Sequence, residues 1–326
     1  MTEEEIRPQA IFHRYLELAA RDTEVYFSQS ELEIVACPAC GATGEDVFTK
    51  HGFTYQECPD CRTLFVSPRP PNEDFSRFYQ EAESVKYWAT TFYKETAEAR
   101  RVKLWQPKAR LVYSFLESVG ARDHNVVDIG GGYGIFAEEY QRLSGRAVTV
   151  VEPGPPLAAA CRERGLSVIK RFLEELSSDD LPGGGNRAFV SFELFEHLHA
   201  PSEFLKSLHG LMVPGDWFIF TTLSGAGVDI RSLWNDSKSV FPPHHLNFLN
   251  PQSVSILLRA GGFDSVTVTT PGKLDMDIMF NNQHLIKDRS WQVVLQQSDA
   301  RAREKWQQFI SENNYSSHMM VSCRKA

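Results

Sequence analysis

The pattern of hydrophobic and polar positions divides the chain into regions of different character. Between residues 4 and 35, apolar positions recur at near-helical intervals, which predicts a helical lead-in over residues 1–36. From residue 125 onward, short β-branched runs alternate with amphipathic segments, which is typical of parallel strands joined by helical crossovers. The expected strands are 125–129, 147–151, 166–169, 188–192, 217–222 and 265–270, and the expected helices are 135–143, 156–164, 201–211 and 251–260.

Two helix-prone stretches flank this alternating region. Aromatic side chains are dense between residues 75 and 93, and residues 103–119 predict an amphipathic helix before the first strand. Residues 276–313 are polar and helix-prone, while residues 318–323 predict a final strand. We therefore expect a helical cap built from residues 76–120 and 273–314. The aromatic cluster can line a substrate pocket or pack between helices, and its helical spacing favours packing.

Length, composition and charge limit the class of protein. The 326 residues, 42% of them hydrophobic, suffice for one large core and an appendage. The formal net charge of −8 argues against a nucleic-acid partner held by a broad basic surface and favours a small molecule. No run reaches the roughly 18 apolar residues of a membrane span, and the acidic start is unlike a signal peptide. We expect a cytoplasmic protein without a membrane partner, and nothing in the sequence indicates an oligomeric state.

Four of the six cysteines form two C-x-x-C pairs, Cys37 with Cys40 and Cys58 with Cys61. In a reducing compartment, such pairs indicate metal binding rather than a disulfide. Two knuckles on either side of a short hairpin present four thiolates tetrahedrally, the geometry of structural Zn²⁺. We predict a zinc ribbon at residues 37–71, ending in a proline-rich connector, with a redox role for one pair as the alternative.

A glycine-rich turn follows the first strand of the alternating region. Asp128 ends the strand, and Gly130, Gly132 and Gly134 occupy alternate positions before a helix begins. The glycines allow a sharp turn and close approach of a ligand to the free N–H groups of the helix. The spacing lacks the third glycine of the dinucleotide fingerprint G-x-G-x-x-G. Glu152 ends the second strand, where a carboxylate can accept hydrogen bonds from both hydroxyls of a ribose.

The turn, Glu152 and the segment after the fourth strand resemble class I S-adenosylmethionine-dependent methyltransferases of the ubiquinone-biosynthesis type. That segment has the pattern E-x-x-E-H at residues 193–197, and a Pro-Gly turn precedes the fifth strand. The resemblance implies a doubly wound, Rossmann-like α/β fold over residues 121–326, with S-adenosylmethionine as cofactor and a small-molecule acceptor. It also implies that Asp128 and Glu193 serve the methionine moiety. Phe172, after the third strand, either covers the adenine or is core.

Two histidines precede the last crossover helix. Many relatives place a histidine followed by leucine here, so His245 matches the pattern best and His244 is additional. A histidine at this edge of the sheet can take a proton from the acceptor as it attacks the methyl group. The alternative interpretation is that His245 caps the following helix or holds the loop.

A second metal site competes with this base hypothesis. Glu193, Glu196, His197 and His245 resemble the divalent-metal set of the small-RNA 2′-O-methyltransferases, and carboxylates and imidazoles suit such an ion. The order of ribbon and core is similar to that of sugar C-methyltransferases, which implies a nucleotide-sugar or related natural-product or polysaccharide precursor as acceptor. Those enzymes usually carry a further C-terminal domain and a histidine–glutamate–histidine loop, whereas the loop of this chain reads Pro-His-His at residues 243–245. A metal-assisted RNA methyltransferase and a non-catalytic cofactor-binding module remain the alternatives.

Overall fold

The computed structural model describes residues 2–326, and its centre is a seven-stranded sheet in the order β10-β11-β8-β7-β4-β5-β6. Five of the strands run parallel to one another: β4 (Asn125–Ile129), β5 (Val148–Val151), β6 (Ser167–Ile169), β7 (Arg187–Phe192) and β8 (Trp217–Leu223). β11 (His318–Lys325) pairs antiparallel with β8 and with β10 (Phe263–Thr269). The predicted Rossmann-like α/β fold is confirmed, but the last strand makes the sheet mixed rather than wholly parallel.

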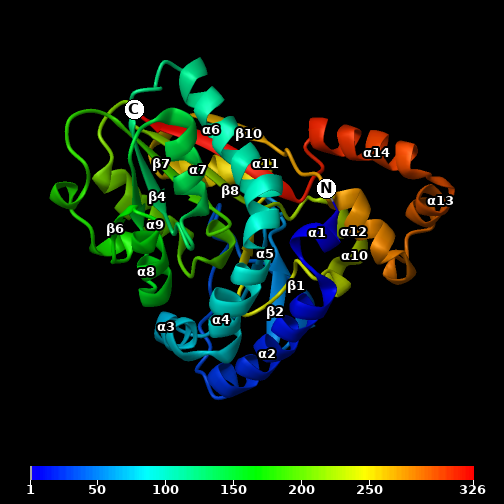
Figure 1. Cartoon of the computed structure of the whole chain (residues 1–326). Helices are drawn as coiled ribbons and strands as arrows, with labels where there is room; N and C mark the ends of the chain where they lie inside the picture. Colours follow the sequence, from blue (N-terminus) through cyan, green and yellow to red (C-terminus); the bar gives the residue numbers. More distant parts are fainter. Residues whose placement is uncertain (1) are drawn as a thin grey trace.

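Helices cover both faces of this sheet (Figure 1). One face packs against α6 (Gln106–Ser118), α7 (Ile135–Ser144) and α8 (Pro155–Glu163), and the other packs against α9 (Pro201–Leu211) and α11 (Pro251–Ala260). Alternate residues of β4 divide between the two cores. Val126 belongs to the first core and Val127 to the second, as the two-residue period of a strand requires.

The ribbon is joined to the α/β domain through a shared sheet. β1 (Glu45–Lys50), β2 (Phe53–Glu57) and β3 (Leu64–Val66) are antiparallel, and β9 (Asn247–Phe248) adds to the free edge of β3. The hydrophobic pattern does not predict β9, because two residues are too few to show a period. The chain directly after His244 and His245 therefore completes the sheet of the ribbon.

The cap is helical, as the sequence predicts. α3 (Asn72–Glu81), α4 (Glu83–Tyr87) and α5 (Tyr93–Arg100) lead into α6 through π-helical segments at Trp88–Phe92 and Arg101–Trp105. Such segments occur frequently at functional sites. Phe75, Phe78 and Phe92 are buried, so this part of the aromatic cluster packs inside the protein.

The two ends of the chain contribute to the cap as well. α1 (Glu3–Ile6) and α2 (Gln9–Phe27) form the lead-in, and α12 (Asp275–Asn281), α13 (Arg289–Gln297) and α14 (Ala300–Glu312) lie between β10 and β11. Figure 1 shows α1 beside α12, where the Glu3 amide donates a 2.7 Å hydrogen bond to Asp277. α12 also contacts α10 (Val228–Leu233), a short helix that the sequence pattern does not predict. None of the described helices is both long and apolar enough to cross a membrane.

Candidate functional site

The glycine turn lies at the carboxyl end of β4, where the strand order reverses between β5 and β7. Gly132 and Gly134 have φ angles of 55° and 73°, a region that disfavours side chains. A Cβ on Gly134 would lie 2.5 Å from Leu166 Cδ1, whereas the nearest atom to a Cβ on Gly132 is the Tyr93 hydroxyl at 3.7 Å. The turn is therefore closed against the core at Gly134 and has room on its outer side at Gly132.

Two buried carboxylates flank this turn. Glu152 accepts hydrogen bonds from the amides of Gly132 at 2.9 Å and Gly154 at 2.8 Å, and burial raises its pKa. Burial, aided by the charge of Glu152, raises the pKa of Asp128 to about 7. Asp128 Oδ2 has no hydrogen-bond partner within residues 2–326. Buried acceptors are normally satisfied, so this oxygen fits a ligand that brings its own donor.

Phe172 follows β6 and is 52% exposed, which rules out the interpretation that it is core. The neighbouring Arg171 already forms an ion pair, because its guanidinium lies 2.8 Å from the Asp180 carboxylate. An exposed ring beside the strand ends can cover a purine face, so the adenine contact stays a prediction.

Glu193 directly follows β7 and has a φ of 53°, which is unusual for a residue with a side chain. Its Oε1 accepts hydrogen bonds from Lys108 Nζ and Thr221 Oγ1, each at 2.8 Å. Burial alone would raise the pKa of Glu193, but the charges of Lys108 and His318 hold it well below its usual range. Strained residues at strand ends often belong to functional sites.

Lys108 is a site residue that the sequence does not single out. It lies on α6 with 12% of its side chain exposed, and its ammonium group is 4.9 Å from the ring centre of Phe192. The one sequence feature that could have indicated Lys108 is its position four residues before the buried Val112, which places both residues on one face of the helix. A lysine on the apolar face of a helix needs a partner, and here Glu193 provides it.

Glu196 and His197, which are consecutive, lie close to His245 of the loop before β9. One ligand atom of each lies within 4.8 Å of the others, and the two imidazole centres are 4.8 Å apart. Glu196 also accepts a 2.9 Å hydrogen bond from Thr222. Glu193, the fourth residue of the predicted second metal site, is not in this group because it pairs with Lys108.

The protonation of His245 follows from its surroundings. Its Nδ1 lies 2.6 Å from the carbonyl oxygen of Ser239, which can only accept, so Nδ1 carries the proton and Nε2 keeps its lone pair. Burial lowers its pKa to about 3. The interpretation of His245 as a helix cap is wrong, because the side chain of Asn250 accepts from the amides of Gln252 and Ser253 at the start of α11. The catalytic role of His245 stays a prediction.

His244 is surrounded by aromatic side chains. Its imidazole is 5% exposed, and burial lowers its pKa well below the usual value. The rings around it are those of Tyr15, Phe78, Tyr79 and Phe241. His244 Nε2 has no hydrogen-bond partner among the described residues, so the predicted catalytic role of His244 competes with packing.

The cysteine cluster has the arrangement expected of a zinc ribbon. The sulfur atoms of Cys37 and Cys61 are 3.5 Å apart, those of Cys40 and Cys58 are 3.4 Å apart, and all four lie within 4.8 Å. The two C-x-x-C turns have the same hydrogen bond. The Gly41 amide donates to the Cys37 carbonyl, and the Arg62 amide donates to the Cys58 carbonyl, each at 2.9 Å. Four thiols at these distances fit a tetrahedral metal site better than a redox disulfide.

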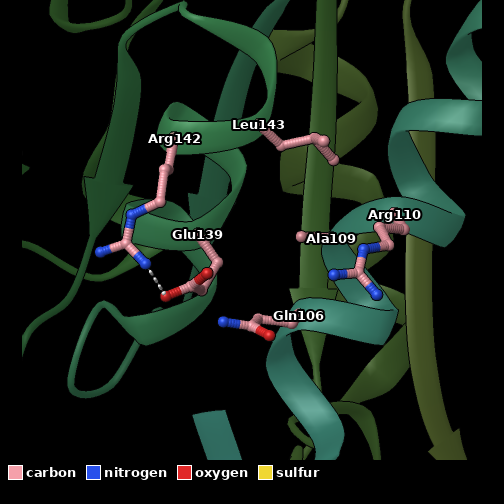
Figure 2. Close-up of a pocket in the computed structure, with 6 residues that line it drawn as sticks. All are labelled: Gln106, Ala109, Arg110, Glu139, Arg142 and Leu143. Atoms are coloured by element: carbon pink, nitrogen blue, oxygen red, sulfur yellow. Dashed lines mark hydrogen bonds and ion pairs between the residues drawn. The ribbon is translucent and has the colours of Figure 1, made fainter. Parts of the chain in front are cut away.

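A cavity of about 240 Å³ lies between α6 and α7 (Figure 2). Figure 2 shows the six residues that line it: Gln106, Ala109, Arg110, Glu139, Arg142 and Leu143. None of the candidate site residues is among them. Arg142 and Glu139 pair with each other at 2.8 Å, so their charges are already balanced, and we do not assign the cavity to the site.

Comparison with known proteins identifies the family. A family model described as a methyltransferase domain matches residues 96–268, more than half of the chain. The ubiquinone biosynthesis O-methyltransferase of Xanthomonas axonopodis pv. citri (strain 306) is 28% identical over 164 residues, which cover 45% of this chain and 64% of that enzyme. The enzyme of the same name from Azotobacter vinelandii (strain DJ / ATCC BAA-1303) is 29% identical over 113 residues, which cover 33% and 48%. The matches thus span less than two thirds of these relatives.

Solved methyltransferase structures are also similar. The 1,6-didemethyltoxoflavin-N1-methyltransferase of Burkholderia thailandensis has a TM-score of 0.47 at 14% identity, covering 86% of this chain and 99% of its own. The plantazolicin methyltransferase in complex with S-adenosylhomocysteine has a TM-score of 0.48 at 11% identity, covering 77% and 94%.

Proposed function

The chain belongs to the methyltransferase domain family, and on this premise we propose that it transfers a methyl group from S-adenosylmethionine to a small polar acceptor. The observation that carries the proposal is the unpartnered Asp128 Oδ2 beside the glycine turn. This turn, Asp128 and Glu152 lie where the strand order reverses, the place at which open α/β sheets bind ligands.

Each part of the cofactor has a candidate partner in this chain. The carboxylate of Glu152 would accept the ribose hydroxyls, and the exposed ring of Phe172 would cover the adenine. Asp128 and Glu193 would accept hydrogen bonds from the ammonium group of the methionine moiety. Lys108 keeps Glu193 ionised, which favours binding of that cationic group.

The proposed chemistry is a direct displacement. A nucleophilic atom of the acceptor attacks the methyl carbon, the carbon–sulfur bond breaks, and S-adenosylhomocysteine leaves. Because the sulfonium is an activated leaving group, alignment of the two substrates supplies much of the catalysis. Where the acceptor must lose a proton, the lone pair on His245 Nε2 would receive it.

A second candidate mechanism uses the group formed by Glu196, His197 and His245. One carboxylate and two imidazoles are suitable ligands for a divalent transition metal. Burial lowers the pKa of His197 to about 4 and that of His245 to about 3, so both imidazoles are neutral near pH 7. Burial and the charge of Glu193 raise the pKa of Glu196 to about 8, so a metal bound near pH 7 would displace the proton of this carboxyl. In this mechanism Glu196, His197 and His245 would hold the metal, which would activate the acceptor in place of a protein base, and RNA becomes a candidate acceptor.

The four-cysteine site is proposed to hold a structural Zn²⁺. Its sulfurs are closely spaced, and three of the four cysteines are buried, which suits a closed site rather than a catalytic one. The ribbon holds the histidine loop at several points. The Val66 amide donates to the Leu246 carbonyl, and Asn250 donates a 2.7 Å hydrogen bond to the Cys61 carbonyl.

The proposed acceptor class is a nucleotide-sugar or a related precursor, as the order of ribbon and core implies. Calorimetric titration of the purified chain with S-adenosylmethionine tests the function itself. We expect one site per chain, and an absence of binding would remove both the methyltransferase proposal and the cofactor-binding alternative. If the cofactor binds, a screen of acceptors for release of S-adenosylhomocysteine separates an enzyme from a non-catalytic module.

A further inference from the structure

Arg100, the last residue of α5, is a buried cation without an anion. It is 7% exposed, and its Nε has no hydrogen-bond partner among residues 2–326. No ion pair of the described chain includes it, whereas the adjacent Arg101 pairs with Glu138 and Glu139. Burial lowers the pKa of Arg100, an effect opposed by the neighbouring Tyr93 and by the charge of Glu193. Glu193 forms its ion pair with Lys108, so Arg100 is a buried charge without an ion-pair partner of its own, which is costly and requires an explanation.

Aromatic rings compensate the charge of Arg100 only in part. Its guanidinium carbon lies 5.4 Å from the ring centre of Tyr93, 5.9 Å from that of Phe92 and 6.0 Å from that of Trp88. Such contacts are favourable, but they leave the Nε–H donor of Arg100 unused. Arg69, which is also buried, shows the alternative, because it donates hydrogen bonds to oxygen atoms of Val66, His199 and Asn247.

A second unpaired cation lies close by. Arg7, between α1 and α2, is half-buried and takes part in no ion pair of the described chain. Its guanidinium carbon is 5.7 Å from the Phe12 ring centre, Phe12 contacts Phe92, and Phe92 contacts Arg100. The charge of Arg7 contributes to lowering the pKa of Arg100 and of His245, so it acts on both. The two cations border the same group of aromatic rings and repel each other, and an anion bound between them would relieve this repulsion.

The arginines lie between the glycine turn and the histidine loop. Tyr93, which contacts Arg100, stacks on Tyr133 of the turn with ring centres 5.0 Å apart. On the other side Trp88 packs on Tyr15 at 4.6 Å, and Tyr15 lies 5.6 Å from His244. An acceptor whose reactive atom faces the methyl group and His245 would therefore extend toward Arg100 and Arg7.

We propose that Arg100 and Arg7 bind an oxyanion of the methyl acceptor, a phosphate or a carboxylate. The inference rests on the proposed function and defines its substrate class as anionic. Guanidinium groups bind both oxyanions through paired N–H donors. The carboxylate of S-adenosylmethionine is the other anion that could bind the arginines. Lys108, beside Glu193 and Thr221, is the cation at the strand ends, where the methionine moiety would lie, so we assign the arginines to the acceptor instead.

Anion titrations of the full-length chain test the proposal. Inorganic pyrophosphate and citrate, as phosphate and carboxylate probes, are titrated into cofactor-free protein and into protein saturated with S-adenosylhomocysteine. We expect at least one of them to bind, and we expect Arg100→Gln and Arg7→Gln each to weaken that binding at least tenfold. Arg110→Gln, at an exposed position on α6, should leave it unchanged. Melting temperatures show whether each variant is folded, and Arg7→Gln at its half-buried position keeps the test valid if Arg100→Gln unfolds.

The same variants separate this inference from the proposed function. Affinity for S-adenosylmethionine should stay within about twofold of wild type in both. A loss of that affinity would mean that the arginines hold the cofactor carboxylate and would overturn the inference. Absence of anion binding to wild-type protein, or binding that neither variant weakens, would also overturn it. Failure of the wild-type chain to bind S-adenosylmethionine counts against the proposed function instead, since the titrations of cofactor-free protein need no cofactor.

Discussion

The Tyr55 hydroxyl donates a 2.7 Å hydrogen bond to the carbonyl oxygen of His245. Tyr55 belongs to β2 of the ribbon and is fully buried, so the bond connects the ribbon to the loop of the candidate base. β9, two residues after His245, pairs with β3 of the same sheet. The ribbon is therefore positioned to support the site and is more than an appendage to the α/β domain.

Tyr55→Phe should impair catalysis without impairing cofactor binding. The change leaves a buried carbonyl oxygen of His245 without its donor, at a cost of about 1–3 kcal/mol. We expect a lower kcat with an unchanged Kd for S-adenosylmethionine. Tyr113→Phe on α6 is the matched control, and equal turnover in the two variants would show that the ribbon does not position the loop.

Cys37→Ser should abolish zinc binding. Metal analysis after exchange into metal-free buffer should find one zinc per wild-type chain and none in the variant, because the site needs four thiolates. We expect the variant also to lose turnover through disorder of the His245 loop. Cys323→Ala, outside the cluster, should keep its zinc, and a wild-type chain without zinc would contradict the ribbon assignment.

Cofactor affinity should depend on the ionisation of Asp128. With its pKa raised to about 7, Asp128 is largely protonated below that pH and cannot accept a hydrogen bond from an ammonium group at full strength. The Kd for S-adenosylmethionine should rise as pH falls below 7, by up to about tenfold per pH unit. Asp128→Asn should remove most of this dependence, and a wild-type Kd that stays constant from pH 8 to pH 5.5 would refute the assignment.

Stability of the ligand-free protein should show the opposite dependence on pH. The folded-state pKa of Asp128 lies above its usual value of 3.8, so the unfolded chain releases this proton at lower pH. The contribution of Asp128 to the free energy of unfolding is therefore present below about pH 4 and is lost as pH rises through 7. Denaturant titrations of wild type and Asp128→Asn across this range isolate that contribution.

His245→Ala distinguishes the two candidate mechanisms when it is combined with metal removal. If His245 is the base, the variant loses turnover and binds S-adenosylmethionine as wild type does, and wild-type protein that holds only the ribbon zinc keeps full turnover. If a metal serves instead, wild-type protein that holds only the ribbon zinc is inactive, and added Mn²⁺ restores its turnover. Unchanged turnover in His245→Ala would exclude both mechanisms, since both use this imidazole.

The sequence predicts elements with a strong hydrophobic period almost residue by residue. α9 and α11 have the predicted bounds, and β4 spans the predicted residues 125–129. β9 and α10 are too short to show a period, and the direction of β11 depends on pairing partners distant in sequence.

The residues of the candidate site also fall into a group that the sequence predicts and a group that it does not. Asp128 and Glu152 are predictable because parallel strands end at one edge of the sheet, and the cysteine pairs are predictable from their spacing. Arg100, Arg7 and Lys108 are not predictable, because their surroundings are set only when separate segments of the cap fold together.

Titration of S-adenosylmethionine into wild-type, Glu152→Gln and Glu174→Gln protein tests whether the cofactor binds at the carboxyl ends of β4 and β5. Glu152 would accept two ribose hydroxyls, and charge-assisted hydrogen bonds contribute about 1.5–3 kcal/mol each, so we expect Glu152→Gln to weaken binding about tenfold or more. Glu174 is exposed after β6, and its variant should bind as wild type does. Equal affinity in all three proteins, or no binding to wild type, would contradict the account.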